Sequence, residues 1–160
     1  MGKWFTYGLT AAVCACFLVA APLQSASAAD PIKIRRAVMK ELSGHSKAFK
    51  KFFKGGKTKK AIARAGTAGD LVFRAMAIAS LADRVPSLFP KGSDKGKTRA
   101  KAEIWQKWAD FEKAVKAFQD ATGKLVEAAD SGDMAAVGAA MGNLGQACGG
   151  CHKPFRKPKG

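Results

Sequence analysis

The sequence predicts an all-α protein folded as an antiparallel four-helix bundle, and three observations lead to this prediction. Alanine and lysine are plentiful and β-branched residues are sparse, which favours helix over strand. Apolar residues recur every three or four positions in four segments after residue 30. Short breaker clusters separate these segments, so consecutive helices are expected to run antiparallel. Another all-α arrangement of the same helices is the alternative.

The first helix is expected at about residues 32–53. Asp30 supplies an N-terminal cap and Pro31 suits the first turn. Gly55 and Gly56 are expected to end the helix. Its apolar face consists of Ile34, Val38, Leu42, His45, Phe49 and Phe52.

The second helix is expected at about residues 59–85, although Gly66 and Gly69 weaken its middle. Pro86 and Pro90 follow it, and proline does not continue a helix. One face carries Ile62, Val72, Met76 and Ala79, with Phe73 and Leu81 beside it.

The third and fourth helices are expected at about residues 100–129 and 133–155. Ser131 and Gly132 separate them, and Asp133 is a plausible N-terminal cap for the fourth helix. The third helix carries the stripe Ile104, Trp108, Phe111, Val115, Phe118 and Leu125, and the fourth carries Val137, Met141, Leu144, Cys148 and Cys151.

The first 28 residues have the order of a secretory signal peptide: Lys3, an apolar run, and then small residues. Cleavage is expected after Ala28 or Ala29, which leaves residues 29–160 as one exported domain in the periplasm. An uncut membrane anchor is the alternative, because the apolar run is nearly long enough to span a bilayer. Cleavage also removes Cys14 and Cys16, so that two cysteines remain.

Those two cysteines belong to Cys148-Gly149-Gly150-Cys151-His152, which matches the haem attachment pattern C-x-x-C-H. Helix positions three apart lie on the same face, so both sulfurs can reach the two vinyl groups on one edge of a haem. The adjacent imidazole of His152 can bind the iron, and the two glycines leave room for the macrocycle. The motif therefore predicts one covalently bound haem c.

Three alternatives to haem remain open at this stage. A redox dithiol usually lies at the N-terminus of a helix, whereas this pair lies near a predicted helix end. A zinc site could use Cys148, Cys151 and His152 with His45 as the fourth ligand, but adjacent Cys151 and His152 suit haem better. The third alternative is a haem-free helical module with a structural or thiol role.

The charge is strongly basic, with 28 Lys and Arg against 12 Asp and Glu. Such a field steers encounters with an acidic redox partner protein or an anionic membrane surface, and general solubility is the alternative explanation. Nucleic-acid binding is not expected, because the chain is exported and lacks a stacking platform or helix-turn-helix signal. No nucleophile, base and orienting group are arranged for hydrolysis, so an enzyme is not expected.

With this motif at the end of a four-helix pattern, the chain resembles the cytochrome c′ family, the class II c-type cytochromes, over residues 31–157. Residues 34–39 are similar to the haem-facing stretch of the family's first helix. Residues 85–90 are similar to the end of its second helix, and Ile104-Trp105 to the opening of its third. The resemblance implies a haem within the bundle, with the first helix over its distal face, and a homodimer formed through the first two helices.

The resemblance also assigns individual residues. It implies that His152 is the proximal iron ligand and that Arg35 lies near the haem propionates. Arg36 is expected to share that role, because a guanidinium pairs well with carboxylates. Arg156, four residues after His152, is expected to approach the iron-bound imidazole or a propionate. A solvated basic face is the alternative for all three arginines.

Met39 matches the family position over the distal face of the haem. In low-spin relatives a methionine there binds the iron, which suits electron transfer, and we expect Met39 to do so. The alternative is a buried core methionine beside five-coordinate, high-spin iron that binds nitric oxide or carbon monoxide. His45 lies on the same helix face, but is expected to be half-buried with a local hydrogen-bond partner rather than a ligand.

Overall fold

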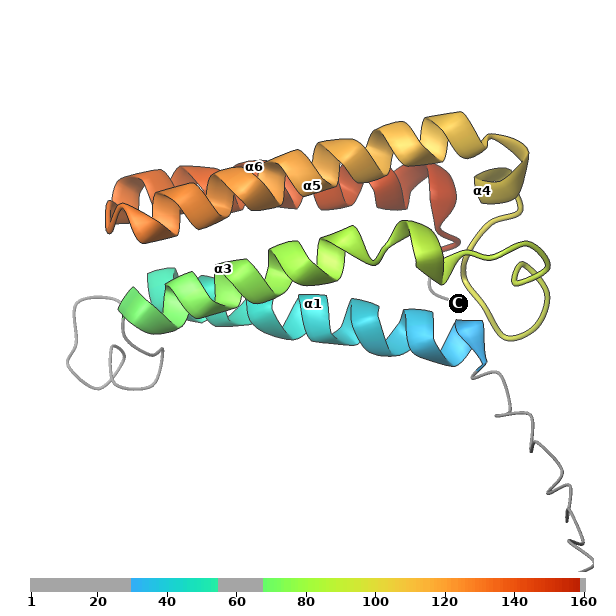
Figure 1. The fold of residues 1–160 in the computed structure, drawn as a ribbon, viewed down its shortest axis with the longest axis horizontal. Helices are drawn as coiled ribbons and strands as arrows, with labels where there is room; N and C mark the ends of the chain where they lie inside the picture. Colours follow the sequence, from blue (N-terminus) through green and yellow to red (C-terminus); the bar gives the residue numbers. More distant parts are fainter. Residues whose placement is uncertain (1–29, 55–67, 159–160) are drawn as a thin grey trace, which may run out of the picture.

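The computed structural model describes residues 30–54 and 68–158, and four long helices of these residues form an antiparallel bundle (Figure 1). This arrangement confirms the all-α fold. A 3₁₀ turn and a short helix lie in the connection between the second and third long helices. The elements are α1 (Pro31–Lys54), α3 (Ala68–Asp83), η1 (Pro86–Leu88), α4 (Glu103–Gln106), α5 (Trp108–Asp130) and α6 (Met134–Phe155).

The N-terminal cap of α1 is confirmed. Asp30 Oδ1 accepts a hydrogen bond from the backbone N–H of Ile32 at 2.8 Å, and Pro31 is the first helical residue. The helix continues to Lys54. The expected terminators Gly55 and Gly56 lie outside the described residues, as does the signal segment 1–28.

The described part of the second helix, α3, buries a different stripe from the one predicted. Leu71, Ala75 and Ile78 are buried, whereas Phe73 and Met76 are 70% and 57% exposed. The prediction for Met76 was wrong because apolar residues surround most of this helix, so periodicity alone does not select the buried face. The neighbouring helices select it. The predicted start, with Ile62, lies outside the described residues.

The third predicted helix is interrupted. The helical conformation is interrupted at Lys107, whose φ of −123° and ψ of 55° separate α4 from α5. Helix does not begin at Ala100, because that residue pairs with Arg156 in an isolated antiparallel β-bridge. The Lys101 N–H also donates to the Phe155 carbonyl at 3.0 Å. Pairing with the end of α6 thus keeps this stretch extended.

Helix α6 closely matches its prediction. Asp133 Oδ1 accepts from the N–H groups of Ala135 and Ala136, at 2.8 and 3.2 Å, which confirms the cap. The helix ends at Phe155, three residues after His152. The motif therefore occupies its last two turns.

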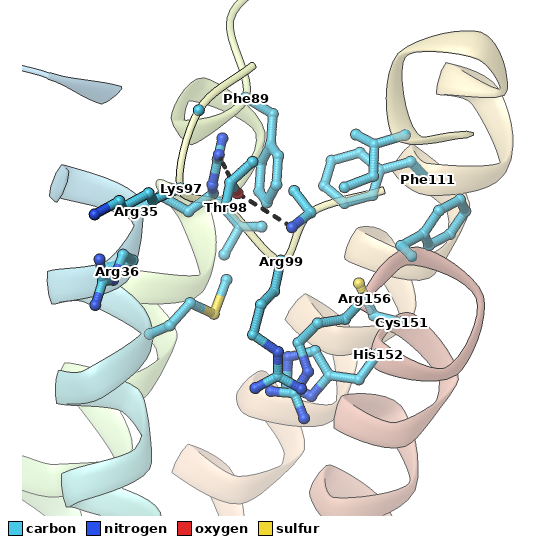
Figure 2. A pocket seen from close by; sticks show the side chains of 16 residues that line it. Arg35, Arg36, Phe89, Lys97, Thr98, Arg99, Phe111, Cys151, His152 and Arg156 are labelled. Carbon is cyan, nitrogen blue, oxygen red and sulfur yellow. Dashed lines mark hydrogen bonds between the residues drawn. The ribbon is translucent and has the colours of Figure 1, made fainter. Parts of the chain in front are cut away.

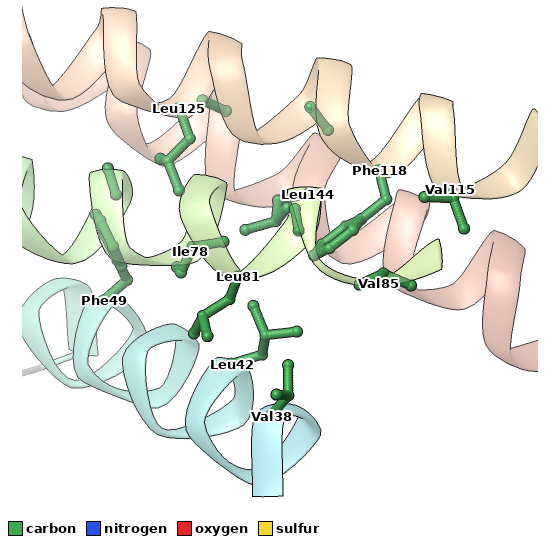
Figure 3. Close-up of a cluster of buried hydrophobic side chains, with 14 of the residues drawn as sticks. Val38, Leu42, Phe49, Ile78, Leu81, Val85, Val115, Phe118, Leu125 and Leu144 are labelled. Atoms are coloured by element: carbon green, nitrogen blue, oxygen red, sulfur yellow. The ribbon is translucent and has the colours of Figure 1, made fainter. Parts of the chain in front are cut away.

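The core lies between the four long helices, and α5 packs against both α3 and α6 (Figure 3). Helix α1 packs mainly on α3 and η1, and it touches α6 only sparsely. Within the described residues, no helix is long and apolar enough to cross a membrane. The buried side chains shown in Figure 3 include Val38, Leu42 and Phe49 of α1, Ile78 and Leu81 of α3, Val115, Phe118 and Leu125 of α5, and Leu144 of α6.

Candidate functional site

A pocket of about 680 Å³ lies between α1 and the C-terminal end of α6 (Figure 2). This volume lies within the range of roughly 300–1,000 Å³ that is usual for ligand and cofactor sites. Helix α1 contributes one wall and α6 the opposite wall, and the residues before α4 close one end. The lining residues are Arg35, Arg36, Met39, Val85, Phe89, Gly96, Lys97, Thr98, Arg99, Ala100, Ile104, Phe111, Cys151, His152, Phe155 and Arg156.

Of the three functional side chains in the motif on α6, two line this pocket. Cys151 and His152 line the pocket, and both are half-buried. Cys148 lies one turn earlier on the same helix face, half-buried against the core, and is not among the lining residues. Both cysteines are free thiols. The structure thus brings the three residues to one side of α6, with Cys148 set back from the opening.

The environment of the thiols disfavours a redox dithiol. Burial raises the pKa of the Cys148 thiol. Burial, with a further contribution from Cys148, raises the pKa of the Cys151 thiol to about 11. A reactive redox cysteine needs the opposite shift, since the thiolate is the nucleophile. The position of the pair at the C-terminal end of α6 also disfavours a redox dithiol, because the helix dipole there opposes the negative charge of a thiolate.

His152 lies in a surrounding that favours its neutral form. Burial lowers the pKa of its imidazole, and the nearby charges of Arg156 and Arg99 lower it further. Figure 2 shows both guanidinium groups close to the imidazole. Neutral imidazole is the form that binds a metal ion.

The zinc alternative is not supported. Across residues 30–54 and 68–158, no three or more His, Cys, Asp or Glu side chains converge as a metal-binding group. His45 is half-buried and does not line the pocket. Its Nδ1 atom has no hydrogen-bond partner among the described residues, so the local partner expected from the sequence is not found there.

Arg35 lines the pocket, yet most of its hydrogen-bonding capacity is used by other residues. It is only 4% exposed, and its guanidinium stacks over the Phe89 ring at 4.7 Å. Its Nη1 and Nη2 atoms donate four hydrogen bonds, one to the last residue of η1 and three to the segment between η1 and α4. Arg36, the next residue, is exposed and lines the opening. Contact with a propionate stays a prediction for both arginines.

Arg99 was not singled out from the sequence, although it lies close to His152. Its Nε and Nη2 atoms donate to the Lys157 carbonyl at 3.0 and 2.7 Å. The adjacent bridge between Ala100 and Arg156 places Arg99 and Arg156 beside each other. The only sequence signal was membership of a basic run, because the partners of Arg99 lie more than 50 residues away.

Met39 lies on the α1 wall of the pocket. Its side chain is half-buried and also packs against the hydrophobic core. This location agrees with the position expected over the distal side. Iron ligation by Met39 stays a prediction.

The residues of the pocket fit a haem. Phe89, Ile104, Phe111 and Phe155 give apolar surface suited to the porphyrin. The opening carries cationic side chains suited to two propionate groups, and the lining includes no Asp or Glu. Thiol and imidazole groups lie together on one wall. The cationic residues of the opening are Arg36, Lys97, Arg99 and Arg156.

Comparison with known proteins agrees with this fit. The family model described as Cytochrome C′ matches residues 30–156. Cytochrome c′ of Rhodospirillum rubrum is 38% identical over 135 residues, covering 82% of this chain and 86% of the relative.

Two solved structures have the same fold. Cytochrome c prime from Shewanella frigidimarina is 35% identical with a TM-score of 0.71, covering 81% of this chain and 96% of that one. A nitric oxide complex of a mutant cytochrome c prime from Alcaligenes xylosoxidans is 29% identical with a TM-score of 0.71, covering 81% and 95%. The family match, the relatives and the pocket lead to one conclusion: the chain belongs to the cytochrome c′ family and is a c-type haem protein with one covalently bound haem c.

Proposed function

We propose that the protein is an exported cytochrome c′ that binds a small uncharged gas, nitric oxide or carbon monoxide, at an open distal site. Cys148 and Cys151 form the thioether links to the haem, and His152 is the proximal ligand. The haem iron supplies gas binding and one-electron redox chemistry when it is bound. The chain's contribution is to hold the haem, to supply one axial ligand and to leave the opposite side open.

The observation that carries this proposal is the unequal chemistry of the two pocket walls. The α6 wall presents the neutral imidazole of His152. The α1 wall presents two arginines and Met39. A guanidinium stays protonated and cannot bind iron, so among the described residues of that wall Met39 is the only candidate ligand. A methionine packed against the core behaves as an apolar side chain, and apolar surface at this position admits uncharged gases more readily than anions.

The relatives support the same choice. The R. rubrum relative is named a cytochrome c′, and the A. xylosoxidans structure is a nitric oxide complex. Both similarities extend over about four-fifths of this chain. They favour gas binding over the electron-transfer function that was preferred from the sequence.

The second candidate function is an electron carrier in which Met39 is the sixth ligand. The position of Met39 on the wall opposite His152 favours it. Thioether sulfur suits haem iron, and an iron with two protein ligands changes little on electron transfer.

The visible and electron paramagnetic resonance spectra of the purified holoprotein distinguish the two functions. We expect a high-spin ferric spectrum, ready carbon monoxide uptake by the ferrous form, and the same ferric spectrum in Met39→Leu, which conserves volume but lacks the sulfur. A low-spin wild type that Met39→Leu converts to high spin would establish the electron carrier instead.

Export and periplasmic location form part of the proposal and have a separate test. Residues 1–28 should be absent from the mature protein, so that N-terminal sequencing of the holoprotein should begin at Ala29 or Asp30. A mature chain that retains Trp4 and the apolar run after it would indicate the membrane anchor.

A further inference from the structure

The contacts that fix the separation of the two pocket walls lie at one end of the pocket. Helix α1 carries Met39, and α6 carries His152. Each helix packs well against its neighbour in the bundle, α1 on α3 and α6 on α5, but they touch each other only sparsely. Direct packing between α1 and α6 therefore does little to fix the width of the pocket.

A segment of the chain connects the two walls. Residues 88–101, which we call the strap, run from η1 to the start of α4 and contribute Phe89 and residues 96–100 to the lining. At one end of the strap, Lys101 N–H donates to Phe155 O at 3.0 Å. The Lys157 N–H donates to Arg99 O at 2.8 Å, and the Arg99 side chain donates back to Lys157 O. The strap is thus fastened to the end of α6.

Arg35 fastens the strap to α1. Its Nη1 donates to Leu88 O at 3.1 Å and to Ser93 Oγ at 3.2 Å. Its Nη2 donates to Ser93 O at 3.1 Å and to Thr98 Oγ1 at 2.9 Å. Thr98 Oγ1 also accepts from the Ala100 N–H at 3.1 Å, which joins the Arg35 contacts to the part paired with α6.

Burial makes these contacts strong and specific. Arg35 is 4% exposed and Ser93 is 5% exposed, so their polar groups have little access to water. Hydrogen bonds from a charged guanidinium are stronger than neutral ones, and losing the donor leaves buried carbonyl groups unpaired. Arg35 and Met39 are four residues apart and lie on the same face of α1. The hydrogen bonds that fix Arg35 against the strap therefore also fix the face of α1 that carries Met39.

We propose that Arg35 is a positioning residue for the distal site. By tying α1 to the strap, and through it to the end of α6, it sets the separation of Met39 from the proximal wall and keeps the methionine sulfur from binding the iron. The inference rests on the proposed gas-binding function. It gives Arg35 a role that its exposed neighbour Arg36 does not share.

The test is Arg35→Gln in the haem-loaded protein, which keeps a polar side chain but removes the charged fork. Release of the strap should let α1 approach α6, and a low-spin, Met39-bound form should appear in the ferric spectrum. If Met39 closes the site nine-tenths of the time, carbon monoxide association falls about tenfold, because only the open fraction binds. Amide hydrogen exchange should also accelerate at residues 98–101.

Two further variants isolate the cause. Met39→Leu in the Arg35→Gln background should restore the high-spin spectrum and the association rate, because leucine has no sulfur to bind iron. Arg84→Gln makes the same change at an exposed arginine outside the pocket and should leave spectrum and rate as in the wild type. If Arg35→Gln does not accumulate with haem, Thr98→Val removes a single acceptor and should give a smaller shift in the same direction.

The outcomes separate the inference from the function on which it rests. A high-spin wild type whose Arg35→Gln variant has a lower unfolding temperature, but the same spectrum and carbon monoxide rate, would show that Arg35 only stabilises the fold. Faster carbon monoxide association in the variant would also overturn the inference. A low-spin wild type would overturn the proposed function, and this inference with it.

Discussion

Neighbouring residues of the same type have different surroundings at this pocket. Arg35 and Arg36 are adjacent, but a helix turns by roughly 100° per residue, so only one of them points into the protein. Arg35 is buried and hydrogen-bonded to the strap, whereas Arg36 is exposed at the opening. The first therefore shapes the pocket, and the second is free to meet a charged group from outside.

The two cysteines also differ in position, since only Cys151 lines the pocket. We expect Cys148→Ala and Cys151→Ala each to keep haem attached through the remaining thioether, and the double variant to hold no covalent haem. Each sulfur supplies one independent bond, so either alone prevents release. Mass spectrometry after denaturation in acidified organic solvent measures this directly. Complete haem loss from one single variant would contradict attachment through both residues.

At the scale of helices, α6 depends on its first turn for a defined start. Asp133 satisfies two N–H groups that have no partner within the helix. Asp133→Ala should lower the free energy of unfolding by ~1 kcal/mol, the usual loss for removing an N-terminal cap. Denaturant unfolding of the holoprotein checks the value.

A matched control for this prediction lies three residues earlier. Asp130 is exposed at the C-terminal end of α5, where a negative charge is unfavourable. Asp130→Ala should therefore leave stability unchanged or slightly raised. Equal losses in both variants would show that the effect comes from charge removal and not from the cap.

Helix α3 exposes large apolar side chains on its outer face. Phe73 is 70% exposed and Met76 is 57% exposed. Exposed apolar surface favours association, and a homodimer through the first helices is implied by the family resemblance. We expect a dimer by light scattering, and Phe73→Glu should shift it toward monomer because a charge would be buried at the interface. Lys124→Glu on the exposed side of α5 is the control, and an unchanged mass in both variants would exclude this surface.

At the scale of the whole molecule, positive charge dominates, and part of it lies where the pocket opens. Arg36, Lys97, Arg99 and Arg156 line the opening without a carboxylate among the lining residues. Two haem propionates would offset part of this charge. An acidic partner protein or an anionic membrane surface stays a prediction for the remaining field.

This field leads to a kinetic prediction. Reduction of the ferric protein by an anionic reductant such as dithionite should slow as salt rises, because ions screen charges over about 10 Å at 0.1 M. Lys97→Gln should weaken the salt dependence, while Lys124→Gln, near the far end of α5, should not. Stopped-flow rates at several ionic strengths measure both. A rate independent of salt would exclude steering by the opening.

Sequence alone was sufficient where the determining contacts are local. The caps at Asp30 and Asp133 join residues two or three apart, and both were predicted correctly. The spacing of Cys148, Cys151 and His152 on one helix end is equally local, and the haem chemistry and family followed from it.

Only the tertiary structure decided which face of α3 is buried, where the third helix begins, and how the pocket is enclosed. Arg35 reaches the strap across 53 to 63 residues, and Arg99 reaches Lys157 across 58. Helical periodicity carries no information about such pairs, because they depend on how complete helices pack. The sequence thus determined the residues that can hold a haem, whereas long-range hydrogen bonds from α1 and the end of α6 to the strap determined the shape of the pocket.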